Sequence, residues 1–81
     1  MNIKIYSTTW CGPCKNAKSL LDQKGLKYLE IDIEKENMSR EDLFNLVGGR
    51  TVPQIIINGD RIGGFEDLVK YDNLGKLKAA K

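Results

Sequence analysis

The sequence predicts a small α/β domain in which a four-stranded mixed sheet is flanked by helices, in the order β-α-β-α-β-β-α. Three observations lead to this class. Short β-branched runs alternate with stretches of helical hydrophobic spacing, Asn58-Gly59 is a hairpin signal between the last two runs, and 81 residues suffice for one modest core. We therefore expect a single domain over residues 1–81.

The first strand and the first helix meet at the only two cysteines of the chain. Residues 3–6 are Ile-Lys-Ile-Tyr, a pattern typical of a short strand. A helix is expected from about Gly12 to Lys24, because apolar residues recur there at helical spacing and Gly25 suits the position just after a helix. Cys11 and Cys14 therefore lie where the first helix begins.

The next two elements follow from a strand-like run and a capping signal. Leu26 to Ile33 is expected to form a second strand, which a right-handed crossover would place parallel to the first. A second helix should begin near Ser39, whose hydroxyl can cap it while Asp42 occupies the favourable N3 position. Gly48-Gly49 should end this helix. We expect its buried side to consist of Leu43, Leu46 and Val47.

The last third of the chain predicts a hairpin followed by a helix. Gln54 to Ile57 is a strongly apolar strand, and Asn58-Gly59 predicts a type I′ turn. Arg61-Ile62 then begins a short return strand, and a final helix is expected from about Glu66 to Leu74.

The placement of the cysteines indicates thiol–disulfide chemistry. A thiolate attacks disulfide sulfurs, and the first turn of a helix offers unpaired N–H groups and a positive dipole end to an anion. The Cys11 thiolate should be stabilised in this way. The amide of Cys14 is its expected hydrogen-bond donor, since Pro13 has no N–H, and Lys15 is a nearby positive charge. Cys14 lies one turn inside the helix, and we expect it to be buried, to remain a thiol at rest and to act as the resolving group.

Two other interpretations of the cysteine pair are weaker. A purely structural disulfide closing so short a loop would constrain the unfolded chain by only about 2 kcal/mol. A closed zinc site needs four ligands, whereas the chain has no other cysteine and no histidine. Redox chemistry is thus favoured, and no metal is expected.

Composition agrees with a small intracellular carrier. The net charge is +2, with acids and bases interspersed, which gives little reason to expect a nucleic-acid partner. The Lys-rich tail, with Lys76, Lys78 and Lys81, is interpreted as a solvated helix end. No apolar run approaches the length that spans a bilayer, and the start of the chain shows no leader, so we expect no membrane association, a cytoplasmic location and a monomer.

Three motifs in register make the chain resemble a glutaredoxin, a family with the thioredoxin-like fold, over essentially its whole length. They are the residues before the cysteines (Ile5-Tyr6-Ser7), the segment before the third strand (Gly49-Arg50-Thr51-Val52-Pro53-Gln54), and the entry to the last helix (Ile62-Gly63-Gly64-Phe65-Glu66-Asp67-Leu68).

The resemblance implies a glutathione site around the cysteines. Val52-Pro53 is implied to be a cis peptide that faces the cysteines and leaves the Val52 backbone free to pair with a substrate. The amides of Phe65 and Glu66, after Gly64, would hold the γ-glutamyl carboxylate. Asp67 matches the family acid that meets the glutathione amine, although an ordinary first-turn acid is the alternative.

The chain also departs from the family pattern. Glutaredoxins usually carry Cys-Pro-Tyr-Cys, whereas Gly12-Pro13 and the preceding Trp10 belong to the thioredoxin active site. Many glutaredoxins place a Lys where this chain has Thr8, so one contact to the glycine carboxylate is missing, and Arg50 is expected to replace it in part. Thioredoxins have a buried Asp where this chain has Ile5. Phe65 is either an exposed aromatic beside the cleft or a half-buried residue at the helix start.

We therefore predict a dithiol glutaredoxin that reduces protein disulfides or glutathione mixed disulfides, with Cys11 attacking, Cys14 resolving and glutathione as reductant. The alternative is a thioredoxin-like electron donor, for example to ribonucleotide reductase, that is reduced by thioredoxin reductase. A further alternative is an iron–sulfur carrier in which two chains each donate Cys11 and two glutathione molecules complete the ligands.

Overall fold

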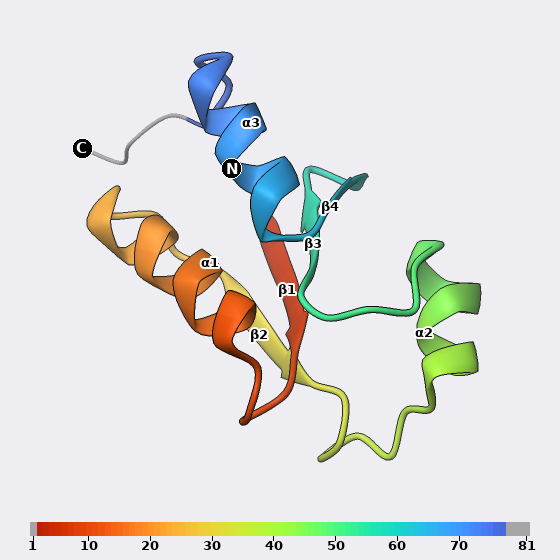
Figure 1. Cartoon of the computed structure of the whole chain (residues 1–81). Helices are drawn as coiled ribbons and strands as arrows, with labels where there is room; N and C mark the ends of the chain where they lie inside the picture. The colour runs from red at the N-terminus through yellow and green to blue at the C-terminus, as the bar shows by residue number, and fades with distance from the viewer. Residues whose placement is uncertain (1, 78–81) are drawn as a thin grey trace.

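The computed structural model describes residues 2–77. Lys78 and Lys81, which were assigned to a solvated helix end, lie outside this part. Seven elements follow one another along the chain (Figure 1): β1 (Ile3–Ser7), α1 (Gly12–Gln23), β2 (Leu29–Asp32), α2 (Arg40–Val47), β3 (Gln54–Ile57), β4 (Asp60–Gly63) and α3 (Phe65–Asn73). This is the predicted order. No helix within the described residues is both long and apolar enough to cross a membrane.

The four strands form one mixed sheet in the order β2-β1-β3-β4. β1 is parallel to β2, with Tyr6 opposite Ile31, and antiparallel to β3, with Ile5 opposite Ile55. β3 and β4 form the predicted hairpin, in which Asn58 and Gly59 have φ values of 53° and 87°. Positive φ at both central positions is the requirement of a type I′ turn.

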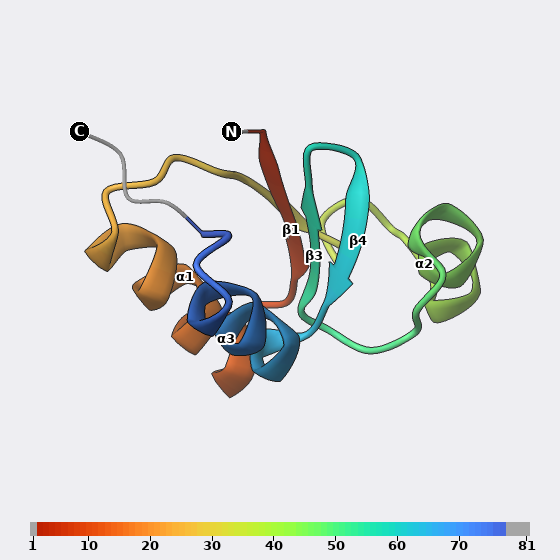
Figure 2. The same ribbon diagram turned by 90° about the horizontal axis from the view of Figure 1, so that it is seen from above.

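The alternation of side chains along β1 creates two apolar clusters, one on each face of the sheet. α1 and α3 lie together on one side of the strands, while α2 stands apart from them (Figure 2). The larger cluster lies between the sheet and the helices α1 and α3, and consists of Ile3, Ile5, Ala17, Leu21, Leu26, Ile55, Ile57, Leu68 and Leu77. The smaller cluster consists of Tyr6, Ile33 and Leu43.

The second strand is shorter than predicted, because its first residues complete the end of α1. Gly25 has φ 69°, and the N–H of Leu26 donates to the carbonyl of Leu21 at 3.0 Å. Leu26 is therefore bound to the helix end and packs into the larger cluster instead of pairing with β1. Pairing begins only at Leu29, so the prediction of a strand from Leu26 to Ile33 was wrong at its start.

The second helix begins as predicted but buries a narrower side. Ser39 and Asp42 form a reciprocal capping box, with both hydrogen bonds at 3.0 Å. Leu43 is fully buried, whereas Leu46 is 59% exposed, so its assignment to the buried side was wrong. The helix meets the sheet along Leu43 and Val47, which are one turn apart, and this line leaves Leu46 facing outward.

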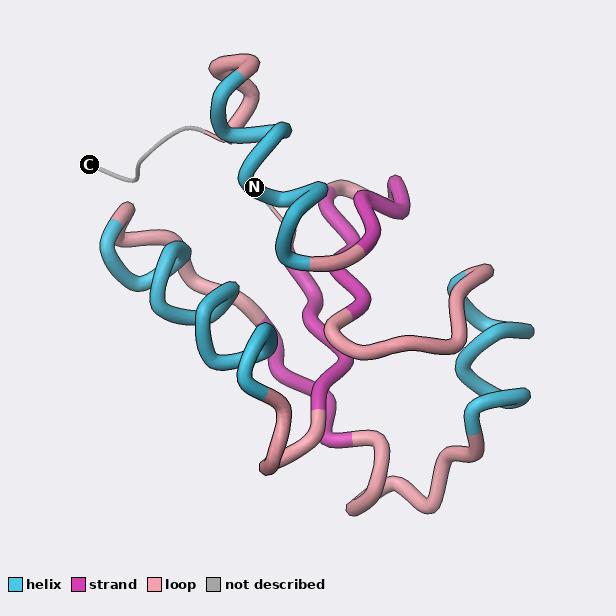
Figure 3. The backbone as a smooth tube through the Cα atoms, in the orientation of Figure 1, coloured by secondary structure: helices cyan, strands magenta, loops and turns pink. Residues whose placement is uncertain are grey.

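The other element ends differ from the predictions by one residue. α1 ends at Gln23, β4 begins at Asp60, and α3 begins at Phe65 and ends at Asn73. These shifts are within the normal uncertainty of helix and strand ends. Two loops adjoin the motifs, the one before α1 and the one between α2 and β3 (Figure 3).

Candidate active site

Cys11 caps the N-terminus of α1 with its own sulfur. The backbone N–H of Cys14 donates to Cys11 Sγ at 3.2 Å, which is the donor that the sequence predicted. The first turn of α1 contains no acidic residue. Both cysteines are free thiols, and Cys11 is 5% exposed. The helix N-terminus and the Cys14 amide thus point toward the position of the Cys11 sulfur.

Cys14 is completely buried, on the side of α1 that also carries Ala17 and Leu21. Burial and, second, the hydrogen bond with Cys11 raise the pKa of Cys14 to about 12, against smaller opposing effects from the Thr8 amide and the Lys18 ammonium. The protein therefore holds this sulfur as a neutral thiol at rest, in agreement with the prediction.

The loop before β3 forms the wall opposite Cys11. The Val52–Pro53 peptide bond is cis, as the resemblance implied. The thiol of Cys11 donates to the carbonyl oxygen of Val52 at 3.6 Å, so the two segments are in contact although 41 residues separate them.

A buried amide that the sequence reasoning missed holds this loop. Gln54 is 2% exposed; its Nε2 donates to Thr51 Oγ1 at 3.2 Å, and its Oε1 accepts from Arg61 Nε at 3.1 Å. Gly49 makes room for it, since a Cβ there would lie 2.5 Å from Gln54 Nε2. A polar residue in an otherwise apolar strand was the available signal, because a buried amide needs partners.

The glycine pair turns the chain into α3 and brings an acid to the cleft. Gly63 has φ 117°, a conformation that glycine alone adopts readily. Asp67 Oδ2 accepts the N–H of Gly64, the residue that caps α3, at 3.1 Å. Phe65 is half-buried against the larger cluster, which decides between its two interpretations in favour of packing at the helix start.

Two hollows adjoin along the loop that contains Val52. One, of about 370 Å³, is lined by Trp10, Cys11, Gly12, Pro13, Arg40, Arg50, Thr51 and Val52. The other, of about 350 Å³, is lined by Pro13, Thr51, Val52, Pro53, Gln54, Arg61, Gly64, Phe65, Glu66 and Asp67. Cys11 and every residue expected to contact glutathione thus line one of the two hollows, whereas Cys14 and Lys15 line neither.

Arg40 is a second residue that the sequence reasoning missed. Its Nη1 donates to the carbonyl of Arg50 at 3.1 Å, and its guanidinium lies over the Trp10 ring, 5.9 Å from the centroid. The Arg50 guanidinium lies 4.7 Å from the centroid of the Phe44 ring. Arg40 directly follows the cap of α2, where the helix dipole disfavours a cation. That unfavourable placement was the signal in the sequence.

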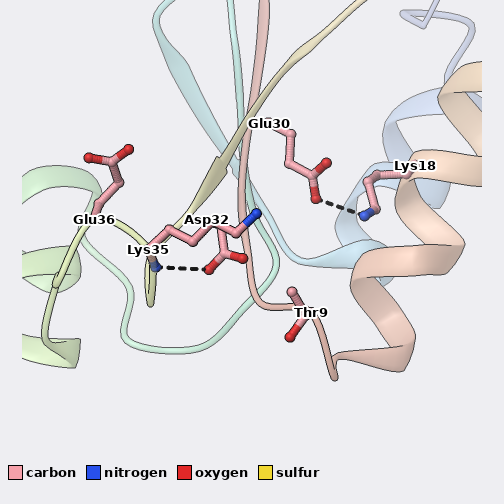
Figure 4. A pocket seen from close by; sticks show the side chains of 6 residues that line it. All are labelled: Thr9, Lys18, Glu30, Asp32, Lys35 and Glu36. Carbon is pink, nitrogen blue, oxygen red and sulfur yellow. Dashed lines mark hydrogen bonds and ion pairs between the residues drawn. The ribbon is translucent and has the colours of Figure 1, made fainter.

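A larger hollow, of about 430 Å³, lies between α1 and the end of β2 and contains neither cysteine in its lining (Figure 4). It is lined by Thr9, Lys18, Glu30, Asp32, Lys35 and Glu36. Lys18 Nζ and Glu30 Oε2 are 2.7 Å apart, and the Ser7 hydroxyl donates to the same oxygen at 2.8 Å. The hydrogen bond from Lys18 lowers the pKa of Glu30, and the same hydrogen bond raises the pKa of Lys18.

Thr8, which stands where many glutaredoxins have a lysine, points into the protein. It is 2% exposed, and its hydroxyl has no hydrogen-bond partner within residues 2–77. Ile5 is fully buried in the larger cluster. Neither position therefore brings a charge to the site.

Comparison with known proteins identifies the relatives of this chain. The glutaredoxin family model matches residues 3–62. Glutaredoxin 3 of Escherichia coli K12 is 40% identical over 76 residues, covering 94% of this chain and 92% of the relative. A glutaredoxin of Pseudomonas aeruginosa is 40% identical over 77 residues, covering 95% and 92%.

Solved structures show the same similarity. A crystal structure of a buckwheat glutaredoxin–glutathione complex matches with a TM-score of 0.82 and 33% identity, covering 93% of this chain and 71% of the other. An Escherichia coli glutaredoxin matches with a TM-score of 0.73 and 30% identity, covering 93% and 99%.

Proposed function

The chain belongs to the glutaredoxin family of thiol–disulfide oxidoreductases, and on that premise we propose that it takes its electrons from glutathione, with Cys11 as the attacking thiol and Cys14 as the resolving thiol. One observation carries the assignment of roles. Cys11 Sγ receives the Cys14 amide at the helix N-terminus and lines the cleft, whereas Cys14 Sγ is fully buried.

The reaction divides into two exchanges. The Cys11 thiolate attacks one sulfur of the substrate disulfide, forms a mixed disulfide and releases the other substrate sulfur as a thiolate. Cys14 then loses its proton and attacks Cys11, which releases the second substrate thiolate and leaves a Cys11–Cys14 disulfide. Two glutathione molecules reverse this oxidation by the same chemistry. The first attacks Cys11, forms a mixed disulfide and releases Cys14, and the second attacks the bound glutathione, which releases Cys11 and glutathione disulfide.

Glutathione would lie along the two adjoining hollows. The free backbone of Val52 would pair with its cysteine, and the amides of Phe65 and Glu66 at the start of α3 would bind the γ-glutamyl carboxylate. Asp67, which lines this cleft while it caps α3, would meet the amine.

The glycine carboxylate would then lie at the opposite end of the cleft, near Arg50. Arg40 lines the same hollow and is hydrogen-bonded to the Arg50 backbone, so the two guanidiniums would compensate for the lysine that is absent at Thr8. The similar buckwheat glutaredoxin forms a complex with glutathione, which supports this class of ligand.

A second electron source is favoured by the loop between the cysteines. Trp10-Cys11-Gly12-Pro13-Cys14 is the thioredoxin form of the motif, and Trp10 is 63% exposed at the edge of the cleft. A flavoprotein thioredoxin reductase is therefore the alternative reductant. The protein substrate, a cytoplasmic location, a single domain and a monomeric state remain predictions from the sequence.

The two sources are separated by mixing oxidised protein either with glutathione, glutathione reductase and NADPH, or with thioredoxin reductase and NADPH. We expect NADPH consumption in the first mixture. Cys11→Ser should abolish activity, because no other thiol can begin the exchange, whereas Cys14→Ser should retain removal of glutathione from a mixed disulfide and lose reduction of protein disulfides. Consumption only with thioredoxin reductase, or equal losses in both variants, would contradict the proposal.

A further inference from the structure

The second exchange has a difficulty that the first does not. In the reduced protein Cys14 is fully buried, and its pKa is raised to about 12, first by burial and second by its hydrogen bond with Cys11. The second effect ends once Cys11 carries a glutathionyl group, whereas burial continues to oppose the thiolate that Cys14 must become. Thioredoxin-type sites have a buried carboxylate at the position of Ile5, and here that side chain is apolar and packed in the core. The structure must favour the Cys14 thiolate in another way.

Both favourable and unfavourable effects act on the ionisation of the Cys14 sulfur. Cys11 and burial oppose its ionisation, while the Thr8 amide and the Lys18 ammonium favour it. Lys18 lies one turn after Cys14 on α1, and residues four apart share one side of a helix. Side chains on a helix also lean toward its N-terminus, which directs Lys18 back toward Cys14.

Lys18 does not move freely as an ordinary surface lysine would. Its ammonium is 2.7 Å from Glu30 on β2, and its side chain is only 25% exposed. Glu30 is in turn fixed by the hydroxyl of Ser7 on β1, at 2.8 Å, and Ser7 is fully buried. A hydrogen-bonded series across three elements thus fixes the Lys18 ammonium, paired with the Glu30 carboxylate, one helix turn after Cys14.

The same pair has access to solvent. Lys18 and Glu30 both line the hollow of about 430 Å³, and they point toward one another in Figure 4. The other charged groups of this hollow are Asp32, Lys35 and Glu36. Lys35 makes no side-chain ion pair among the described residues, and its backbone N–H donates to Asp32. Lys35 therefore offers a matched charge in the same hollow without the connection to Cys14.

We propose that Lys18, held by Glu30 and Ser7, is a positioning residue for the resolving step, in which its charge favours the thiolate of Cys14. The proposal rests on the roles assigned above to the two cysteines. In this step the Cys14 thiol gives its proton to a base in solvent, and its electron pair forms the bond to Cys11. The bond between Cys11 and glutathione breaks, and glutathione leaves as a thiolate that takes a proton from water.

The test follows this single step. Cys11 of the full chain is loaded with a glutathionyl group by a glutathione thiosulfonate at about pH 5, where thiolate attack is slow. The pH is then raised rapidly to values between about 6 and 9, and quench-flow measures the release of glutathione as the disulfide closes. The proteins are the wild type, Lys18→Met, Lys18→Arg and Lys35→Met.

We expect Lys18→Met to slow release about three- to tenfold and to move the whole pH profile upward by roughly half to one unit, because the rate follows the thiolate fraction of Cys14. Lys18→Arg should restore most of the rate, and Lys35→Met should match the wild type. In a Cys14→Ser background, Lys18→Met should leave turnover of a glutathione mixed disulfide through Cys11 unchanged.

Two results would overturn the proposal. One is an unchanged pH profile for Lys18→Met. The other is an equal loss of release rate in Lys18→Met and Lys35→Met, which would indicate an effect of net positive charge in this hollow and not of Lys18 itself. If the wild type itself fails to release glutathione after loading, the assignment of Cys14 as the resolving thiol is wrong, which is a distinct outcome from failure of the role of Lys18.

Discussion

Replacing Gly63 by Ala should cost stability and glutathione affinity together. At φ 117° a side chain is strained, at a cost of about 1 to 3 kcal/mol. The new Cβ would also overlap the carboxylate of Asp67, which must then leave the N–H of Gly64. Loss of such a helix cap costs about 1 kcal/mol more, so we expect a total of roughly 2 to 4 kcal/mol.

Gly59 offers a matched control for the strain alone. It also has a positive φ, 87°, but a Cβ there would meet no atom within 4 Å. Gly59→Ala should therefore cost about 1 kcal/mol, without any change at the cleft. The difference in KM between the two variants reports the displacement of Asp67, because only a Cβ at Gly63 reaches that side chain.

Urea unfolding and glutathione kinetics check both parts. Loss of about 1 kcal/mol of binding at Asp67 should raise the KM for glutathione about fivefold in Gly63→Ala, while Gly59→Ala should leave KM unchanged. Equal unfolding free energies for the two variants, with KM the same in both, would refute the reasoning that Gly63 exists to make room for Asp67.

Two further predictions concern the charged pair and the loop between the cysteines. Glu30→Gln should lower the unfolding free energy at pH 7 by less than about 1 kcal/mol, since the ion pair is partly exposed. Because Lys18 lowers the pKa of Glu30, the pair stabilises the fold above the unfolded pKa of about 4.3. The unfolding free energies of the variant and the wild type should therefore become equal as the pH falls through the folded pKa. The double change Gly12→Pro with Pro13→Tyr should raise the reduction potential from about −270 mV into the usual glutaredoxin range of about −200 to −230 mV, measured against a glutathione redox buffer. A wild-type potential already at about −200 mV would show that the surrounding scaffold sets it.

The features that could be predicted from the sequence are those with a local cause. The Cys14 amide reaches Cys11 because both belong to one helical turn, and the capping box at Ser39 joins residues three apart. The hairpin at Asn58-Gly59 follows from the positive φ that both residues tolerate. In each case the relevant partner lies within a few residues, so the pattern alone is sufficient.

What escaped prediction depends on contacts between distant segments. Leu46 has the spacing of a buried residue, but only the line through Leu43 and Val47 meets the sheet, because α2 lies away from the other two helices. Arg40 reaches the cleft only because α2 and the loop before β3 turn toward Trp10. Helical periodicity describes one helix at a time. It does not show which of the apolar residues of that helix another element packs against.

The structure also explains how a thioredoxin-type loop is compatible with a glutaredoxin framework. Trp10 is 63% exposed, and a Cβ on Gly12 would meet no atom within 4 Å, so neither residue is required by the packing of the core. The parts that would bind glutathione are different ones, at Val52 and at the start of α3, where buried or strained positions fix the backbone. The loop can therefore vary without disturbing the core, although Gly12 and Pro13 line the cleft. We therefore expect the residues between the cysteines to tune the relative stability of the two redox states.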